Sequence, residues 1–589
     1  MEQFYTDERN VQILIALLKK HGIKHIVASP GSTNVTFVGS VQQDSFFEIY
    51  SCVDERSAAY MACGLAAEIM QPVVLSCTGA TASRNYFPAL TEAYYRKLPI
   101  LAVTSTQEES KIGQLIPQVI DRSIQPADTV KMSVHLQTVK DDDDQWNVML
   151  KANMAILELS HRGYGPVHIN LTTRYSKKFA IKSLPEVNKI SRVMPFDSFP
   201  ELSVNGKIAL YIGTHLRWTE AETELIDKFC ALYNAVVFND PASNFHGHYR
   251  LDYALNASQS SSDPNRSPDL LIHVGEMSDF CSIIENPKQV WRISPDGKIQ
   301  DRYHALSHVF EMPESYFFQH YNALRENGPE SDSYLQSCLS AQKRILSNLP
   351  QLPFSHLYVA SKLYDKLPKG CTLHLGILSP LRSWGYFPLD KSIEVYCNEG
   401  GFGIDGNMSS LLGASLACPD KLFFGVVGDL SFFYDMNVLG NRHIQCNFRI
   451  LLINNSLGAE FHLFKQLNSV YVNNIDWYLS AGNHFGNQSP VLVKHYAENL
   501  GYEYLSASSK QEFIQCYERF ITPELTEKPM IFEIFTQVDN ENEALKQIWN
   551  IEVPGAKTII KQSIKKILGD KVVNLIKDCL LYTSDAADD

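Results

Sequence analysis

The sequence predicts an α/β protein made of three doubly wound parallel-sheet domains. Short apolar runs alternate with helical patterns, an order typical of parallel α/β domains. The chain has 589 residues, too many for one hydrophobic core. Stretches punctuated by Pro and Ser at 178–205 and by Pro at 349–353 mark the breaks between domains. We therefore expect domains at residues 1–180, 206–345 and 346–553, with a linker at 181–205.

The first domain opens with a predicted helix at residues 6–21, which Asp7 could cap. Apolar runs then predict four strands, and small or polar residues follow them at Ser29–Ser32, Asp54–Ala59 and Thr78–Ala82. Function in parallel sheets lies at such strand ends. The predicted strands are 25–28, 46–52, 73–77 and 100–104.

The second and third domains continue the same alternation. The second shows no catalytic constellation, whereas the third carries the sharpest motif of the chain. Strands are predicted at 207–211, 236–238 and 270–274 in the second domain, and at 372–375, 393–396, 423–427, 450–453 and 530–534 in the third.

Two charged stretches are interpreted without a catalytic role. The acidic run 141–144 precedes a helix, where carboxylates are favourable, so we interpret it as a solvated cap and not a metal site. Residues 554–577 form a basic amphipathic pattern that suits a peripheral helix on the protein's own body, or docking on a partner or membrane surface. The last residues, 578–589, resemble translated adapter sequence, and we expect a non-native, disordered tail.

Bulk composition excludes several classes of protein. The net charge of −13 argues against a nucleic-acid surface. No window approaches the ~18 apolar residues of a membrane span, and the first residues lack a signal-peptide layout. The 12 cysteines are scattered without C-x-x-C or zinc spacing, as expected in a reducing compartment. We predict a cytoplasmic protein.

A carboxylate and an amide follow two successive predicted strands of the third domain. The run 422–427 ends at Gly428-Asp429, and the run 450–453 ends at Asn454-Asn455. A right-handed crossover would bring both ends to one edge of the sheet. Asp429 and Asn455 then suit Mg2+ bound to a diphosphate. The alternative is a buried Asp that caps the following helix, with the two Asn residues forming a turn.

This motif resembles that of thiamine diphosphate (ThDP) enzymes. The form GDLSFFYDMN is most similar to the 2-succinyl-5-enolpyruvyl-6-hydroxy-3-cyclohexene-1-carboxylate (SEPHCHC) synthases of menaquinone biosynthesis. The resemblance covers about residues 6–550. It implies a pyrimidine-binding first domain, a middle domain and a diphosphate-binding third domain. It also implies Mg2+ ligation by Asp429, Asn455 and the Leu457 carbonyl, and cofactor contacts from Gly428, Asp429, Leu430, Ser431, Asn455, Gly403 and Ile404.

Glu55 matches the catalytic carboxylate of the resembled family. There the glutamate hydrogen-bonds the pyrimidine ring of the cofactor. The alternative is a carboxylate at a helix start that pairs with Arg56. The family also implies a homodimer, or a dimer of dimers, with each site formed between two subunits.

The glycine loop at 398–406 supports a rival class. In the resembled family this loop meets the pyrimidine, and Ile404 wedges the cofactor into a bent shape. Gly401, Gly403 and Gly406 also spell G-x-G-x-x-G, the fingerprint of a dinucleotide-dependent oxidoreductase. That rival does not account for Asn454-Asn455. A binding protein without turnover is a third class, and retention of Glu55 and both Mg2+ ligands weighs against it.

The predicted substrate pocket departs from the resembled synthases. Thr33, Gln107 and Glu399 stand where those enzymes carry arginines that suit multiply anionic substrates. We interpret the chain as a ThDP- and Mg2+-dependent enzyme that decarboxylates a small 2-oxo acid, such as pyruvate. The lack of a proton-donating His pair favours carboligation of the product to an acceptor. SEPHCHC synthesis from 2-oxoglutarate and isochorismate is the alternative. The candidate substrate residues are Ser32, Arg84, Gln118, Arg382 and Glu399.

Overall fold

The computed structural model describes residues 3–202, 206–259, 262–329, 332–463 and 475–552. The predicted basic helix at 554–577 and the tail at 578–589 lie outside these residues. The chain divides into two compact units, residues 1–201 with 289–313, and residues 202–288 with 314–589. Across the described ranges, no helix combines the length and apolar character needed to cross a membrane.

The first unit contains a six-stranded sheet whose neighbouring strands are all parallel. This arrangement confirms the predicted α/β class. The spatial order is β3 (Glu48–Ser51), β2 (His25–Ala28), β4 (Val73–Cys77), β5 (Ile100–Thr106), β7 (Val167–Thr172) and β6 (Met132–Leu136). The helices are α1 (Arg9–Lys20), α2 (Val35–Val41), α3 (Glu55–Ile69), α4 (Thr81–Arg84), α5 (Phe87–Arg96) and α6 (Asp142–Glu158).

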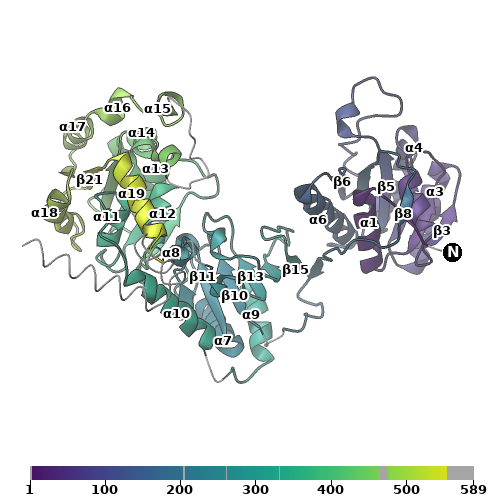
Figure 1. Ribbon diagram of the computed structural model, residues 1–589, viewed down its shortest axis with the longest axis horizontal. Helices are drawn as coiled ribbons and strands as arrows, with labels where there is room; N and C mark the ends of the chain where they lie inside the picture. The colour runs from purple at the N-terminus through teal and green to yellow at the C-terminus, as the bar shows by residue number, and fades with distance from the viewer. Residues whose placement is uncertain (1–2, 203–205, 260–261, 330–331, 464–474, 553–589) are drawn as a thin grey trace, which may run out of the picture. The chain divides into compact units, whose positions relative to one another are not determined.

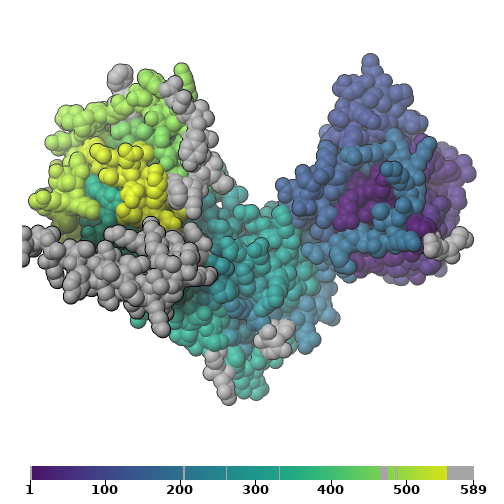
Figure 2. Space-filling view, viewed as in Figure 1, coloured from purple at the N-terminus to yellow at the C-terminus, as the bar shows by residue number. Residues whose placement is uncertain are grey.

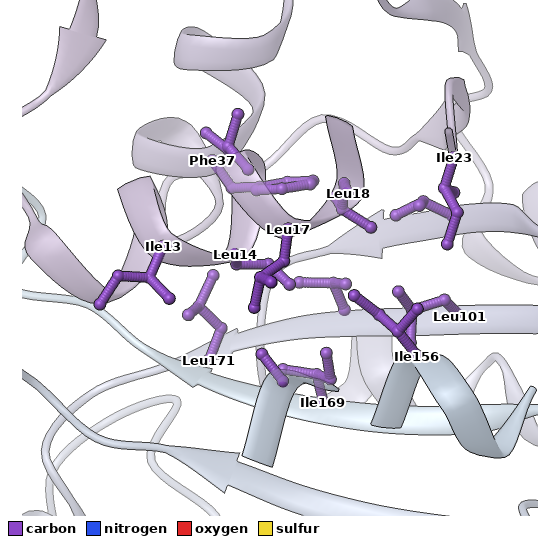
Figure 3. Close-up of a cluster of buried hydrophobic side chains, with 14 of the residues drawn as sticks. Ile13, Leu14, Leu17, Leu18, Ile23, Phe37, Leu101, Ile156, Ile169 and Leu171 are labelled. Carbon is purple, nitrogen blue, oxygen red and sulfur yellow. The ribbon is translucent and has the colours of Figure 1, made fainter. Parts of the chain in front are cut away.

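Helix α1 packs its apolar stripe onto this sheet (Figure 3). Leu14 and Leu17 lie against the strand residues Leu101 and Leu171, all of them fully buried. Burial of this size, ~1.5–3 kcal/mol per large apolar side chain, explains why a helix with a strong apolar face docks there.

The prediction that Asp7 caps α1 is wrong. The N-cap position is Glu8, and no side chain caps the helix there. The Glu8 carboxylate instead accepts hydrogen bonds from the Thr173 hydroxyl at 2.9 Å and the Ser176 N–H at 2.9 Å. It therefore fixes the segment that follows β7. The acidic run behaves as predicted, because Asp141 caps α6 by accepting from the Asp144 N–H at 2.8 Å.

Part of the predicted linker is regular structure. Strand β9 (Ser191–Val193) pairs in parallel with β15 (Leu306–Phe310), which pairs with β14 (Gln289–Ile293). A short β8 (Phe179–Ile181) pairs antiparallel with β1 (Tyr5–Thr6). These strands are too short to give a clear periodic signal in the sequence.

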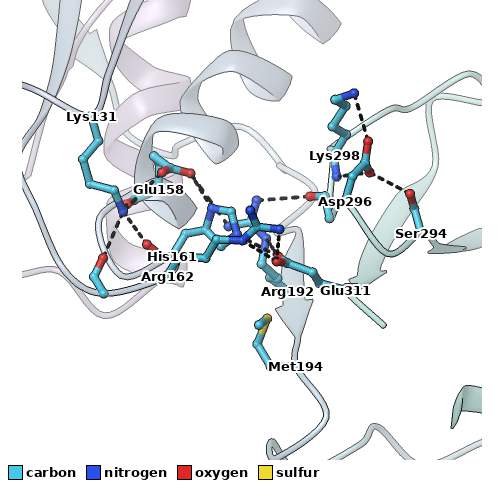
Figure 4. A network of polar contacts seen from close by, with 12 residues as sticks. Lys131, Glu158, His161, Arg162, Arg192, Met194, Ser294, Asp296, Lys298 and Glu311 are labelled. Carbon is cyan, nitrogen blue, oxygen red and sulfur yellow. Dashed lines mark hydrogen bonds and ion pairs between the residues drawn. The ribbon is translucent and has the colours of Figure 1, made fainter. Parts of the chain in front are cut away.

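An ionic network ties the strands β9 and β15 to the end of α6 (Figure 4). His161 contacts Glu158 at 2.9 Å and Glu311 at 2.7 Å. Arg162 pairs with the same Glu311 at 2.7 Å, and Arg192 reaches it at 3.5 Å. Glu311 is buried, and its carboxylate contacts the side chains of His161, Arg162 and Arg192.

The second unit begins with four parallel strands in the order β12 (Arg250–Leu251), β11 (Ala235–Asn239), β10 (Ile208–Ile212) and β13 (Leu270–Val274). Helix α7 (Glu220–Tyr233) starts with a complete capping box formed by Thr219 and Glu222. The other helices of this region are α8 (Ala254–Ala257), α9 (Glu314–Ala323) and α10 (Ser333–Leu346).

The remaining sheet of the second unit repeats the strand order of the first unit's sheet. In both, the second strand along the chain lies at one edge, followed by the first, third, fourth, sixth and fifth. The last strand, β21, lies between β19 and β20. The order is β17 (Glu394–Cys397), β16 (Thr372–Leu375), β18 (Phe423–Gly428), β19 (Phe448–Asn454), β21 (Met530–Phe535) and β20 (Glu503–Ala507).

Helices cover both faces of this sheet (Figure 1). They are α11 (His356–Leu363), α12 (Ser379–Gly385), α13 (Asn407–Ala417), α14 (Asp429–Asp435), α15 (Ile475–Tyr478), α16 (Phe485–Gln488), α17 (Leu492–Asn499), α18 (Lys510–Phe520) and α19 (Val538–Trp549). Helix α19, yellow in Figure 2, lies at the surface of this domain and packs on α11.

Candidate active site

A cavity opens at the carboxyl ends of β16, β18 and β19. Its volume is about 100 Å3. Strands β16 and β18 are the first and third strands of their sheet, so the cavity lies where the strand order reverses, the usual ligand position in open α/β sheets. The lining residues are His356, Gly376–Pro380, Ile404, Gly428–Ser431, Ile453, Asn455 and Leu457–Glu460.

The structure brings Asp429, Asn455 and Leu457 together in this cavity, as the motif predicts. Strands β18 and β19 run in parallel with Gly428 opposite Ile453, so Asp429 and Asn455 leave neighbouring strand ends. Asp429 is only 3% exposed, and its Oδ1 accepts a hydrogen bond from the Leu430 N–H at 2.8 Å. These oxygens come from a carboxylate, an amide and a backbone carbonyl, the donor types that Mg2+ prefers.

Asn455 has the environment of a ligand residue. Its Oδ1 is buried and accepts no hydrogen bond from any described residue. A buried amide oxygen without a donor is costly, so this atom fits coordination of a cation. The turn predicted by the alternative interpretation belongs to Asn454, whose Oδ1 accepts from the Ser456 N–H at 3.1 Å. Within the described residues, no cluster of three His, Cys, Asp or Glu could hold a metal.

A buried carboxylate supports the turn that presents Asn455. Glu533 lies on β21 and is fully buried. It accepts hydrogen bonds from Asn454 Nδ2 at 2.8 Å and from the Tyr504 hydroxyl at 2.7 Å. Burial raises the pKa of Glu533. Asn454 is thus fixed on one side by Glu533 and holds the Ser456 backbone on the other.

Ile404 reaches the cavity from the glycine loop between β17 and α13. Its carbonyl accepts from the Ser431 hydroxyl at 2.6 Å and from Asn407 Nδ2 at 3.0 Å. Asn407 Nδ2 also contacts the Ser431 hydroxyl oxygen at 2.9 Å. Gly406, with φ of 72°, is the left-handed residue that lets the loop turn into α13. Of the predicted loop contacts, Ile404 lines the cavity and Gly403 does not.

Glu55 is the first residue of α3, and a short connection separates it from the end of β3 at Ser51. Asp54 provides the helix cap by accepting from the Ser57 N–H at 2.8 Å, so Glu55 is not needed for that purpose. The Glu55 carboxylate is half-buried and accepts from Asn85 Nδ2 at 3.3 Å. The alternative interpretation requires an ion pair between Glu55 and Arg56. None of the ion pairs among the described residues joins these two side chains.

The other candidate residues of the first domain lie on different elements: Ser32 and Thr33 follow β2, Arg84 ends α4, and Gln118 lies between β5 and β6. Thr33 is buried and contacts the Thr78 hydroxyl. Ser32 and Gln118 are exposed. Arg84 donates to the Asp121 carbonyl at 2.9 Å and lies 5.1 Å over the ring of Phe87. Their contact with substrate stays a prediction.

Arg382 and Glu399 do not line the cavity. Arg382 donates from Nε to Asp279 Oδ2 at 2.6 Å and from Nη1 to Glu460 Oε1 at 2.7 Å. Glu399 is 0% exposed, and its Oε2 accepts from the Asp279 N–H at 2.9 Å. Burial, followed by the charge of Asp240, raises the pKa of Glu399 to about 9, so this side chain is uncharged at neutral pH. An uncharged Glu399 exerts no electrostatic repulsion on a substrate carboxylate.

Sequence reasoning missed two titratable residues of the cavity, His356 and Glu460. His356 starts α11, and burial lowers its pKa to about 3, so the imidazole is neutral. Glu460 lies on the 3-10 turn η6 (Ala459–His462) and is 7% exposed. Neither residue belongs to a motif, and a single His or Glu in a sequence gives no sign that the fold buries it.

The chain is similar to known ThDP enzymes. Residues 9–127 match the family model described as thiamine pyrophosphate enzyme, N-terminal TPP binding domain. The SEPHCHC synthase of Phocaeicola vulgatus is 31% identical over 568 residues, covering 93% of this chain and 99% of that protein. The SEPHCHC synthase of Bacteroides thetaiotaomicron is 31% identical over 571 residues with the same coverage. The solved Rhodococcus jostii RHA1 thiamine diphosphate-dependent 4-hydroxybenzoylformate decarboxylase aligns over 90% of this chain and 100% of that chain at 16% identity, with a TM-score of 0.38.

Proposed function

This chain belongs to the family of the SEPHCHC synthases, which are ThDP-dependent enzymes, and on that premise we propose that it binds ThDP with Mg2+, decarboxylates a 2-oxo acid and joins the remaining acyl unit to an acceptor. The observation that carries the proposal is the cavity in which Asp429, Asn455 and Leu457 meet. The family membership makes an oxidoreductase function for the G-x-G-x-x-G loop unnecessary.

The proposed roles follow from where the side chains lie. Asp429, Asn455 and the Leu457 carbonyl would hold Mg2+, with the diphosphate beside Gly428–Ser431. When bound, ThDP supplies the electron sink for loss of CO2. Ile404, fixed through its carbonyl, would shape the bound cofactor. Glu55 would hold a proton at the pyrimidine nitrogen. The proposed unit is at least a homodimer, in which Glu55 of one chain serves the metal site of the other.

Two kinds of donor substrate are candidates. The names of the relatives support SEPHCHC synthesis itself, from 2-oxoglutarate and isochorismate. Arg382 favours a less anionic donor, because its guanidinium already contacts Asp279 and Glu460. A carboxylate that loses its partner on the protein typically costs ~2–5 kcal/mol, at least ~30-fold in affinity. Thr33 and Gln107, which stand at arginine positions of the family, point the same way.

Cofactor binding is tested by titrating metal-stripped protein with ThDP, followed by intrinsic fluorescence, with and without Mg2+. We expect binding only with Mg2+, because the oxygens of Asp429, Asn455 and Leu457 face an anionic diphosphate and need a cation between them and it. Asp429→Ala should abolish binding, whereas Asp435→Asn, which removes a carboxylate at the other end of α14, should retain it. Tight binding of NAD(H) without binding of ThDP would reverse the proposal.

The substrate is tested by comparing kcat/KM for pyruvate and for 2-oxoglutarate, the latter with and without isochorismate. Loss of the 2-oxo acid is the readout. The contacts of Arg382 predict that pyruvate is preferred. If 2-oxoglutarate is preferred and isochorismate is consumed with it, the reaction is that of the named relatives.

A further inference from the structure

We propose that Glu460 selects the donor substrate by accepting a hydrogen bond from an O–H or N–H group on the 2-oxo acid. This inference rests on the proposed function and adds to it the chemical class of the donor. A 2-oxo acid with a hydroxyl or amino group near its carbonyl would be bound in preference to an apolar or dicarboxylic one.

The two oxygens of Glu460 have different surroundings. Oε1 accepts from Arg382 Nη1 at 2.7 Å. Oε2 is buried and accepts no hydrogen bond from any described residue. The side chain lines the same cavity as Asp429 and Asn455. One oxygen is therefore fixed by the protein, and the other is left for whatever enters the cavity.

A buried carboxylate oxygen without a donor is unfavourable, and such atoms are uncommon in folded proteins. A donor group on a ligand would satisfy it, and a second carboxylate would be repelled. Arg382 does not offset this repulsion, because Asp279 binds the same guanidinium through Nε at 2.6 Å and through Nη2 at 3.4 Å. Two carboxylates thus contact one guanidinium, so these three groups together do not present a positive charge to the cavity.

Glu460 and its partner Arg382 come from two different elements that border the cavity. Residues 454–460 connect the metal-binding turn to η6, so Glu460 follows Leu457, the proposed metal ligand, by one short turn. Arg382 comes from α12, which begins directly after the cavity-lining residues Ile377 and Leu378. The Glu460 carboxylate therefore lies beside the proposed cofactor site. Arg382 of α12 holds it through Oε1.

The test uses a pair of donors that differ in one group. Hydroxypyruvate carries an O–H where 2-oxobutanoate carries a methyl group. For the ThDP- and Mg2+-loaded protein, we expect kcat/KM to favour hydroxypyruvate by at least ~10-fold, the scale of one hydrogen bond to a charged group. Glu460→Gln keeps the size of the side chain but reverses its polarity. Arg382 would hold the amide oxygen, which turns the NH2 group toward the cavity.

In Glu460→Gln the NH2 group can still donate to the hydroxyl oxygen of hydroxypyruvate, but this hydrogen bond lacks the charge of the carboxylate. We therefore expect the preference for hydroxypyruvate to fall at least ~3-fold and the relative kcat/KM for 2-oxoglutarate to rise. Asp279→Asn is the matched control. It removes a charge from the same guanidinium but does not line the cavity, so the preference should persist. The dissociation constant of ThDP, measured by fluorescence, should agree within ~3-fold among the three proteins.

Two results would overturn the inference and leave the proposed function intact. One is equal use of the two donors by the unmodified protein. The other is an unchanged preference in Glu460→Gln, whatever its affinity for ThDP. Failure of the unmodified protein to bind ThDP would instead overturn the proposed function.

Discussion

Glu541 should make the stability of the third domain depend on pH. This residue lies on α19. The backbone N–H of His356 donates to both of its carboxylate oxygens, each at 3.0 Å. Burial raises the pKa of Glu541 from 4.5 to about 7. The folded state therefore binds its proton more tightly than the unfolded chain does. The resulting stability is complete below pH ~4.5 and is lost as the pH rises through 7.

The size of this effect follows from the shift. At ~1.4 kcal/mol per pKa unit, the change in pKa corresponds to about 3 kcal/mol in the free energy of unfolding. For a domain of this size, 1 kcal/mol moves the melting temperature by ~2–4 °C. Between pH 5 and pH 8.5, we expect the unmodified protein to lose roughly 6–12 °C more than Glu541→Gln, which is neutral at every pH.

The assay is thermal unfolding followed by circular dichroism across this pH range. Glu543→Gln is the matched control, because Glu543 is exposed on the same helix and its replacement should leave the pH dependence unchanged. If Glu541→Gln and the unmodified protein lose stability in parallel, the carboxyl group titrates normally and the reasoning from its burial is refuted.

Four further substitutions test the proposed site and its support. Glu55→Gln should retain ThDP binding yet lose at least ~100-fold in turnover, the usual scale for a positioned acid–base group; unchanged turnover would assign Glu55 to the helix start alone. Glu533→Ala should lower the free energy of unfolding by about 3 kcal/mol, because two buried donors lose their acceptor at ~1–3 kcal/mol each. Tyr504→Phe, which removes one of these hydrogen bonds, should lower the free energy of unfolding by about 1 kcal/mol. Urea titration of both variants measures these two changes. Ser431→Ala should weaken ThDP binding several-fold without changing the melting temperature by more than a few degrees, since Ile404 loses one of two hydrogen bonds to its carbonyl; equal affinity would show that Asn407 suffices.

Buried strands were the easiest part of the fold to predict. β2, β4 and β13 have the predicted bounds, because each is a short apolar run that ends at small or polar residues. β6, β7 and β20 were missed. β6 and β20 are the fifth strands of their sheets and lie at the edge, where partly exposed positions carry Ser, His or Glu and break the apolar pattern. β7 is buried, but His168 and Asn170 interrupt its apolar run.

The motif residues of the site were predictable, and the residues around them were not. Asp429 and Asn455 follow strands that the sequence reveals, so parallel topology alone brings them together. Arg382 contacts Asp279 and Glu460, which are 103 and 78 positions away along the chain. No spacing rule links such residues. The sequence shows which arginine positions of the resembled family are replaced here. Only the fold shows that Arg382, which is kept, pairs with Asp279 and Glu460.

The position of β21 also has a consequence for biosynthesis. This strand is the last of its sheet to leave the ribosome, yet it pairs with β19 on one side and β20 on the other. Until it is made, β19 presents an unpaired edge next to the proposed metal-binding turn, and β20 has no place to dock. At ~5–20 residues per second, the nascent chain carries this open edge for seconds to tens of seconds. The first unit's sheet can close early, whereas the sheet that carries the proposed metal-binding turn is complete only after Phe535 has been synthesised.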